Sequence, residues 1–371
     1  MMKISRISPL RISPRIGLVG PLLALALLAA ACGGGGGTKL EGVAATVYDG
    51  DCADDTGSSV TVYSGRSENL MKPVYDAFAC ESGISVRVRW GSSTDLALLV
   101  DTEGDRTEAD VFISRSPGPV GFLESKGLLS SMDSSVLNLV DDDHRGDSGT
   151  WIGFSGRKRV LVHNLDTVPS SDLPFSVFDL TGPKWRGRVA IPATNGSFVD
   201  WFTVFRDQYG DDEATGWLRD MVANDARYYP NNVAIVEAVA RGEIDMGLVN
   251  HYYNYRLAAD AESAGQDHRA ANYDLADQDI GSLLVITAAT MTKNAADRPA
   301  AQSLIAYLLS APAQRYFTSN TYEYPLAAGV EPNPVLPPLS ALSIGSVDFD
   351  ALGGGFEGSE DIIQRSGILS R

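Results

Sequence analysis

The sequence predicts an α/β protein built in two lobes, with central mixed sheets flanked by helices and a ligand cleft between the lobes. Three observations lead to this prediction. Segments typical of strands and of helices alternate from residue 59 onward, and a second set of alternating segments begins near residue 160. After residue 58 the chain keeps about 310 residues, which is enough for two lobes of ordinary size.

The first set of elements precedes residue 114. Its first helix places Leu70, Val74 and Phe78 on one face, and the strand after it alternates apolar with polar side chains. Because strand–helix–strand units need crossover connections, we expect these strands to be parallel. The expected elements are strands over residues 59–63, 84–90 and 109–113, and helices over residues 68–80 and 95–103.

The second set ends near residue 318. Four prolines within residues 331–338 exclude a helix there, and residues 359–369 close the chain as a helix. The expected elements are strands over residues 188–191, 244–249 and 283–288, and helices over residues 197–208, 212–223, 233–241, 296–309 and 313–318.

The cleft should be formed by the segments that follow the strands. In open α/β sheets, ligands bind beyond the carboxyl ends of the strands. The segments in that position are residues 64–68, 114–118, 192–198 and 250–253.

The N-terminus has the pattern of an export signal. Residues 1–15 carry four cations and no acid, and residues 16–31 are almost entirely apolar and end in three alanines. This apolar run is shorter than the roughly 20 residues that span a bilayer. Cys32 and five glycines follow at once, which resembles the bacterial lipoprotein signal. The alternative is an ordinary secretory signal with a chance cysteine.

We therefore expect a signal peptide over residues 1–31 and a flexible tether over residues 32–58, with a lipid on Cys32. The mature protein would lie outside the cytoplasm, lipid-anchored on the periplasmic side or the outer surface of the cell membrane. The two other cysteines, Cys52 and Cys80, are expected to pair in such a compartment, because the first helix runs back towards the start of the first strand. Two free buried thiols are the alternative.

The charge of the chain excludes one class of partner. The formal net charge is −17. Binding to nucleic acid through its phosphates requires a basic face, so we expect no nucleic-acid partner.

The segment VNHYYNYR, residues 249–256, resembles the tyrosine motif of periplasmic ferric-iron-binding proteins of ABC importers. Further segments are similar to that family in the same order, and the match covers roughly residues 59–330. They are VTVYSGR (60–66), GISVRVRWG (83–91), ADVFIS (109–114), WIGFSGRKRVLVHN (151–164), PKWRGRVAIPATNGSF (183–198), NNVAIVEAVARGEID (231–245) and YEYPL (322–326).

The resemblance implies a type II periplasmic-binding-protein fold, in which two lobes close on the ligand. It also implies strands that cross between the lobes near residues 157–163 and 283–288. The lobes implied are an N-lobe over residues 59–156 plus 287–330 and a C-lobe over residues 157–286 plus 335–371.

Two tyrosines match the family's metal ligands. Fe(III) is a hard cation that prefers anionic oxygen donors, and a bound cation favours the phenolate form of tyrosine. Tyr252 and Tyr253 match the adjacent tyrosine ligands of the family and follow a predicted strand. The alternative is that they are packing aromatics at the rim of the core.

The family often completes its site with an exogenous anion held by backbone amides and small polar side chains. The segment Asn195–Ser197 opens a predicted helix, and a helix N-terminus favours anions, although a plain N-cap is the alternative. The matching positions are Asn195, Gly196, Ser197, Asn232 and Asn250.

Three positions depart from the family pattern. Ser67 stands where many members have a histidine, Arg115 where they have a glutamate, and Phe198 where others have a tyrosine. Glu68, next to Ser67, is the expected substitute ligand. Tyr63 is another oxygen donor near that turn, although its position in a strand favours the core.

The arginines of these segments point to an anion. Guanidinium groups bind carboxylate and phosphate through paired hydrogen bonds. We therefore expect Arg66, Arg115 and Arg157 to hold a synergistic anion such as carbonate, phosphate or citrate.

The leading hypothesis is a monomeric receptor that captures Fe(III) with an anion and delivers it to an ABC permease and its ATPase. The first alternative is a solute-binding protein for an organic or phosphate-type anion without iron. The second is an anchored hydrolase, which the sequence disfavours because it contains neither Gly-x-Ser-x-Gly nor a HExxH motif. We expect a binding protein and not an enzyme.

Overall fold

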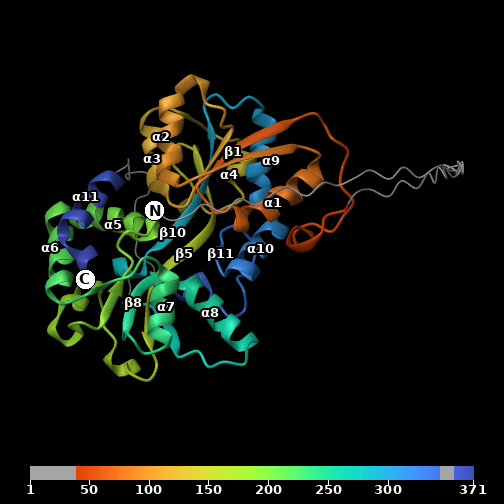
Figure 1. Ribbon diagram of the computed structural model, residues 1–371. Coiled ribbons are helices and arrows are strands. Elements are labelled where there is room, and N and C mark those ends of the chain that lie inside the picture. Colours follow the sequence, from red (N-terminus) through yellow and green to blue (C-terminus); the bar gives the residue numbers. More distant parts are fainter. Residues whose placement is uncertain (1–38, 277, 343–354) are drawn as a thin grey trace, which may run out of the picture. The chain divides into compact units, whose positions relative to one another are not determined.

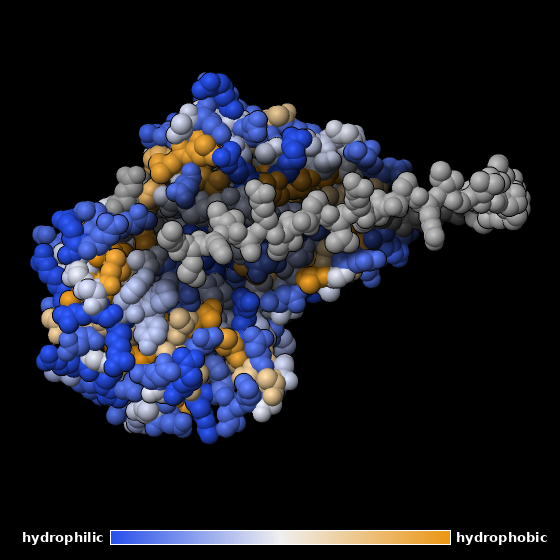
Figure 2. All heavy atoms as spheres, in the orientation of Figure 1, coloured by the Kyte–Doolittle hydropathy of each residue, from blue (hydrophilic) through white to orange (hydrophobic). Residues whose placement is uncertain are grey.

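The computed structural model describes residues 39–276, 278–342 and 355–371 (Figure 1). Within these ranges no helix combines the length and the apolar character that crossing a membrane requires. Cys32 and the predicted signal peptide lie outside the described residues. On the face drawn in Figure 2, hydrophilic residues predominate, in keeping with the high net charge.

The described residues form a mixed sheet whose main path runs β2-β1-β3-β10-β5-β8-β6-β7. β1 is parallel to β2 and β3, as predicted, and β6 is parallel to β7 and β8. β10 is antiparallel to both of its neighbours on the path. The strands are β1 Ser59–Ser64, β2 Ser85–Trp90, β3 Val111–Ser114, β4 Leu129–Ser130, β5 Trp151–Asn164, β6 Val189–Ile191, β7 Arg227–Tyr228, β8 Met246–Asn250, β9 Ala270–Tyr273, β10 Leu284–Thr292 and β11 Tyr324–Pro325.

β5 links the two halves of the sheet. Its residues 151–158 pair with β10, and its residues 159–163 pair with β8. The crossing strand expected near residues 157–163 is therefore longer than predicted, and all of its residues are buried. We call the part of the sheet from β2 to β10 the first half and the part from β8 to β7 the second half.

Helices cover both halves of the sheet. α1, α9 and α10 pack with Phe78, Phe154 and Phe317 on the first half, and α5 and α6 pack around Trp201 and Trp217 on the second half. The helices are α1 Glu68–Ser82, α2 Ser93–Glu103, α3 Pro117–Ser125, α4 Ser134–Leu137, α5 Gly196–Tyr209, α6 Asp211–Ala223, α7 Asn232–Ala240, α8 His251–Ser263, α9 Arg298–Leu308, α10 Ala311–Thr321 and α11 Phe356–Ser366.

Residues 39–58 are folded onto α1, which shortens the expected tether. Cys52 and Cys80 form a disulfide, the pairing expected from the sequence. The backbone N–H of Ala53 donates to the carbonyl of Cys80 at 2.7 Å, and that of Thr56 donates to Gly83 at 3.0 Å. A side chain at Gly83 would meet the Asp54 carbonyl at 2.1 Å, so this close approach requires glycine. The Gly-, Asp- and Thr-rich composition of these residues predicted a flexible linker. Composition alone does not show that a disulfide and two backbone hydrogen bonds tie the segment to the end of α1.

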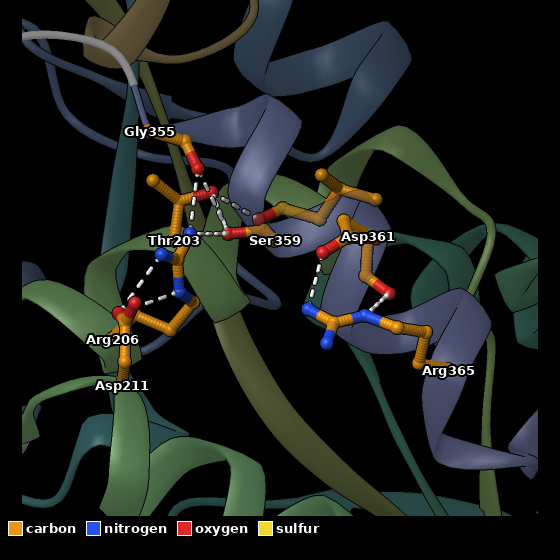
Figure 3. Close-up of polar contacts among 8 residues, drawn as sticks. Thr203, Arg206, Asp211, Gly355, Ser359, Asp361 and Arg365 are labelled. Atoms are coloured by element: carbon orange, nitrogen blue, oxygen red, sulfur yellow. Dashed lines mark hydrogen bonds and ion pairs between the residues drawn. The ribbon is translucent and has the colours of Figure 1, made fainter.

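The C-terminal helix α11 packs against α5 and α6 (Figure 1). Arg206 on α5 donates to the Gly355 carbonyl at 2.7 Å and to the Ser359 hydroxyl at 2.9 Å (Figure 3). Thr203 lies 2.8 Å from the same hydroxyl, and Asp211 pairs with Arg206. α11 therefore holds the C-terminal end of α5 in place. The first turn of α5 reaches the cavity described below.

Candidate metal and anion site

A cavity of about 450 Å³ lies where the strands of both halves of the sheet end. Each of the four segments expected at the cleft contributes to it, together with residues that follow β2. A cavity of this size is in the range of small-molecule sites. Its lining consists of Gly65, Arg66, Ser67, Asn69, Leu70, Gly91, Ser92, Arg115, Arg157, Asn195, Ser197, Tyr252, Tyr253 and Arg256.

Tyr252 and Tyr253 lie side by side in the first turn of α8, directly after β8. Their ring centroids are 4.2 Å apart. Burial and the neighbouring phenol of Tyr253 raise the pKa of Tyr252 above its ordinary value, although Arg157 and Arg66 act in the opposite direction. The phenol of Tyr252 is therefore protonated in the protein without a cation, and a bound cation would favour its phenolate form.

His251 fixes the turn that carries the two tyrosines. Its Nδ1 accepts a hydrogen bond from the backbone N–H of Lys158 at 3.0 Å, so its Nε2 carries the proton and donates to the Tyr322 carbonyl at 2.7 Å. Burial lowers the pKa of His251 to about 4. A neutral, fully bonded histidine thus fastens the start of α8 to β5 and to the segment after α10.

Arg66 is held at the cavity by a buried acid. Glu323 accepts a hydrogen bond from Arg66 and another from the Ser155 hydroxyl at 2.6 Å, and its side chain has no exposed surface. Burial opposes ionisation of Glu323, but the charges of Arg66 and Arg157 outweigh it, so the pKa of Glu323 lies below its ordinary value. Glu323 therefore stays ionised and fixes the position of the Arg66 guanidinium.

Arg157 and Arg159 are buried on the same face of β5, because alternate residues of a strand share a face. Arg159 donates to the carbonyl of Ser197, and its guanidinium lies 5.9 Å from the ring of Trp201. Burial and the charge of Arg157 lower the pKa of Arg159 to about 9. Lys158 lies between them on the other face and pairs with Asp274 at 2.7 Å.

The turn at the start of α5 is tied together by its own side chains. The Asn195 carboxamide oxygen accepts from the backbone N–H of Ser197 at 3.1 Å, from the Ser197 hydroxyl at 2.7 Å and from Asn232 at 3.2 Å. Asn232 also accepts from the backbone N–H of Asn250 at 3.1 Å. The predicted residues are therefore brought together, but of these only Asn195 and Ser197 line the cavity, and Asn232 and Asn250 are buried.

Glycine at position 196 lets Arg115 approach this turn. A Cβ atom on Gly196 would lie 2.5 Å from the Arg115 guanidinium. The two segments come from opposite halves of the sheet, so their contact brings the cationic side chain over the start of α5.

Comparison with known proteins identifies the family. The family of bacterial extracellular solute-binding proteins matches residues 107–349, which is more than half of the chain. The chain belongs to this family. The major ferric iron-binding protein of Neisseria meningitidis is 30% identical over 291 residues, covering 77% of this chain and 86% of the relative. Iron uptake protein A1 of Synechocystis is 29% identical over 329 residues, covering 86% of this chain and 90% of the relative.

Solved structures agree with these relatives. Iron-bound HitA from Pseudomonas aeruginosa superposes with a TM-score of 0.76 at 31% identity, covering 84% of this chain and 99% of that chain. The Trichodesmium protein IdiA (FutA), in complex with iron and citrate ligands, superposes with a TM-score of 0.71 at 28% identity, with the same coverage. The predicted resemblance to ferric-iron-binding proteins and the predicted two-lobe α/β fold are confirmed.

Not every expected site residue of this solute-binding protein reaches the cavity. Glu68 is exposed on the first turn of α1 and does not line the cavity, whereas Ser67 beside it does. Glu68 is the first residue of α1. Phe198 is fully buried and packs on Trp201 in the core.

Sequence reasoning missed two charged residues of this solute-binding protein that the cavity depends on, Arg159 and Glu323. Both lie within segments that carry the family resemblance, WIGFSGRKRVLVHN and YEYPL. For Arg159 the available signal was a charged residue inside a segment of buried strand, since ionised side chains are rarely buried without a partner.

Proposed function

We propose that this protein captures Fe(III) together with an anion in the cavity and delivers it to an ABC permease and its ATPase. The observation that carries the proposal is the pair of adjacent phenols, Tyr252 and Tyr253, at a cavity that is otherwise lined by polar and cationic groups. Phenolate oxygens are donors that a hard trivalent cation prefers. The iron-bound relative and the ferric-iron-binding relatives described above support the same cargo.

The anion is supported by the charge of the cavity. Arg66, Arg115, Arg157 and Arg256 line it, and Fe(III) adds three further positive charges. Two phenolates and Glu323 balance only part of that charge, so an anionic co-ligand such as carbonate, phosphate or citrate would complete the site. The same arginines favour a second candidate, the capture of an organic or phosphate-type anion without iron.

The two proposed lobes are residues 59–156 plus 287–330 and residues 157–286 plus 335–371. We propose that they close on the cargo and that the protein acts as a monomer. Pairing of β5 with strands of both halves of the sheet supports a hinge along that strand. We further propose that Cys32 carries the lipid of an anchored lipoprotein outside the cytoplasm, on the sequence pattern alone. A lipid anchor would keep the receptor close to its permease.

Iron retention tests the proposal. Metal-free protein is mixed with a weak ferric chelate and desalted, and iron is measured per chain. The wild-type protein should retain one iron, and the Tyr252→Phe/Tyr253→Phe variant should retain almost none. Tyr255→Phe is the matched control, because Tyr255 lies on the same helix, is stacked on Tyr322 and does not line the cavity, and it should retain iron like the wild type. A wild-type protein that retains no iron but binds a metal-free anion would establish the second candidate instead.

A further inference from the structure

The segment that precedes β1 forms a closed loop on the first half of the sheet. Lys39 and Asp51 pair as an antiparallel bridge, so the two ends of residues 39–51 lie side by side. Between them, the 3-10 helix Gly42–Thr46 packs against α1, and in Figure 1 the segment is drawn in red beside that helix. The chain therefore enters this loop next to the point where it leaves it.

The disulfide and a backbone hydrogen bond fix the loop to the last turn of α1. Cys52 is bonded to Cys80, and the N–H of Ala53 donates to the carbonyl of Cys80 at 2.7 Å. Val47 is 5% exposed and packs into the core of the first half, where Tyr48 is partly buried. Because covalent, polar and apolar contacts act on the same short segment, we expect it to move with α1 as one body.

This attachment lies far from the ligand cavity. Cys80 is near the C-terminal end of α1, whereas Ser67, Asn69 and Leu70 at the other end of the helix line the cavity. With the rise of a regular helix, the chain from Ser67 to Cys80 spans about 20 Å. A tether that joins the protein at the disulfide is therefore well separated from the residues that bind the cargo.

Few residues remain between the loop and Cys32. Only residues 33–38 separate Cys32 from Lys39. A chain of this length spans at most about 25 Å when it is fully extended. If the whole segment up to Ser58 were free, the corresponding limit would be about 95 Å. The closed loop therefore shortens the greatest reach of a lipid on Cys32 about fourfold.

The surface of the loop does not itself attract a membrane. Residues 39–58 carry five exposed acids and one exposed cation, Lys39. Acidic side chains are repelled by the negative surface of a bilayer that contains anionic lipids. A covalent link, and not a charged contact, would therefore hold this end of the protein near lipid. The acids are Glu41, Asp49, Asp51, Asp54 and Asp55.

We propose that residues 39–58 are a disulfide-closed spacer, which limits the reach of a lipid on Cys32 and holds the first half of the sheet within about 25 Å of the membrane surface. The proposal rests on the anchored lipoprotein of the proposed function. Effective concentration falls roughly as the −3/2 power of linker length, so a free segment up to Ser58 would lower that of the receptor at a permease in the same membrane about sevenfold. The spacer thus keeps the receptor close to its permease.

Neutron reflectometry measures the gap between the protein layer and a bilayer. The chain from Cys32 onward is joined through the Cys32 thiol to a maleimide phospholipid in a supported phosphatidylcholine bilayer, and the other two cysteines do not react because they are bonded to each other. The free residues 32–38 of the wild type should give a gap of about 15 Å. The Cys52→Ser/Cys80→Ser/Val47→Asp variant frees residues 32–58 and should give a gap of about 30 Å.

Two controls leave the disulfide closed. Insertion of about 20 Gly/Ser residues after Gly37 gives as many free residues as the opened variant has, and its gap should match that of the opened variant. Because this insertion does not disturb the fold, it also serves if the opened variant fails to fold. Val43→Asp adds the same charge to the 3-10 helix at a side chain that is 53% exposed, and it should keep the wild-type gap.

Three outcomes overturn the proposal. They are a wild-type gap above about 25 Å, an opened variant with the wild-type gap, and an insertion that does not widen the gap. Because the link to Cys32 is made chemically, none of these results depends on acylation in cells. Mass spectrometry of the protein extracted from cell membranes tests the acylation itself. An unmodified Cys32 removes the lipid anchor of the proposed function, whereas a wide wild-type gap removes the spacer, so the two failures are distinguishable.

Discussion

Removal of the buried acid at Glu323 should destabilise the protein strongly. The Arg66 and Glu323 side chains are 3% and 0% exposed, so neither charge is compensated by water. Glu323→Gln keeps the shape and an acceptor for Ser155 but leaves Arg66 without its counter-charge. Breaking a buried ion pair at one partner costs about 3–5 kcal/mol, and because glutamine still accepts a hydrogen bond we expect about 3 kcal/mol.

The assay is urea unfolding of the wild type and the variant, followed by tryptophan fluorescence and far-UV circular dichroism. Glu237→Gln is the matched control, because Glu237 belongs to an exposed pair with Arg241 and should leave the unfolding midpoint unchanged. Adding Arg66→Met to Glu323→Gln should recover part of the loss, since it removes the uncompensated charge. A change smaller than about 1 kcal/mol in Glu323→Gln would show that the buried Arg66 does not depend on Glu323 for its counter-charge.

The same pair gives a pH dependence. The folded-state pKa of Glu323 is lowered, so its contribution is fully present above its unfolded pKa of about 4.3 and is lost as the pH falls through the folded value. The difference in stability between wild type and Glu323→Gln should therefore shrink below about pH 4. A difference that is constant across that range would contradict the assignment.

Three further changes should alter stability in defined directions. The Cys52→Ser/Cys80→Ser variant opens a loop whose ends are 28 residues apart. Its free energy of unfolding, measured by thermal unfolding, should fall by about 3–4 kcal/mol. A variant as stable as the wild type would show that the disulfide is dispensable. Gly247→Ala places a Cβ atom 2.3 Å from Ile235 and should lower the free energy of unfolding by about 1–3 kcal/mol. Gly216→Ala, on α6, places a Cβ atom that meets nothing within 4 Å and should raise the free energy of unfolding by about 0.5–1 kcal/mol. Urea unfolding measures both. Ser359→Ala removes an acceptor of Arg206 and should cost about 1 kcal/mol and speed proteolysis between α10 and α11; unchanged proteolysis would contradict a fastening role for α11.

Most of the sheet could be predicted from the sequence because its strands are short apolar segments bounded by turn residues. The first-half strands β1, β2 and β3 begin and end within two residues of the prediction. The crossing strand was harder, because Arg157, Lys158 and Arg159 interrupt its apolar pattern. Their side chains are buried because Asp274, the Ser197 carbonyl and the cavity lie beside them. These partners are distant in sequence, so the pattern of apolar residues along the strand cannot predict them.

No helix was predicted after the strand that ends near residue 249, whereas the structure places Tyr252 and Tyr253 in the first turn of α8. Aromatic residues have low helix propensity, so the segment has little local helical signal. Packing of His251 against Lys158 and Tyr322 fixes the turn instead. Glu68 shows the converse case, since its closeness to Ser67 in sequence does not bring its side chain into the cavity.

The visible spectrum reports directly on whether Tyr252 and Tyr253 coordinate the iron. Purified protein is titrated with a ferric chelate that is itself colourless in the range of tyrosinate-to-iron charge transfer. Coordination by both tyrosines should give an intense visible band that saturates at one iron per chain, is abolished in Tyr252→Phe/Tyr253→Phe and is unchanged in Tyr255→Phe. A saturated, iron-loaded wild-type protein without this band, or a band that survives in the double variant, would contradict it.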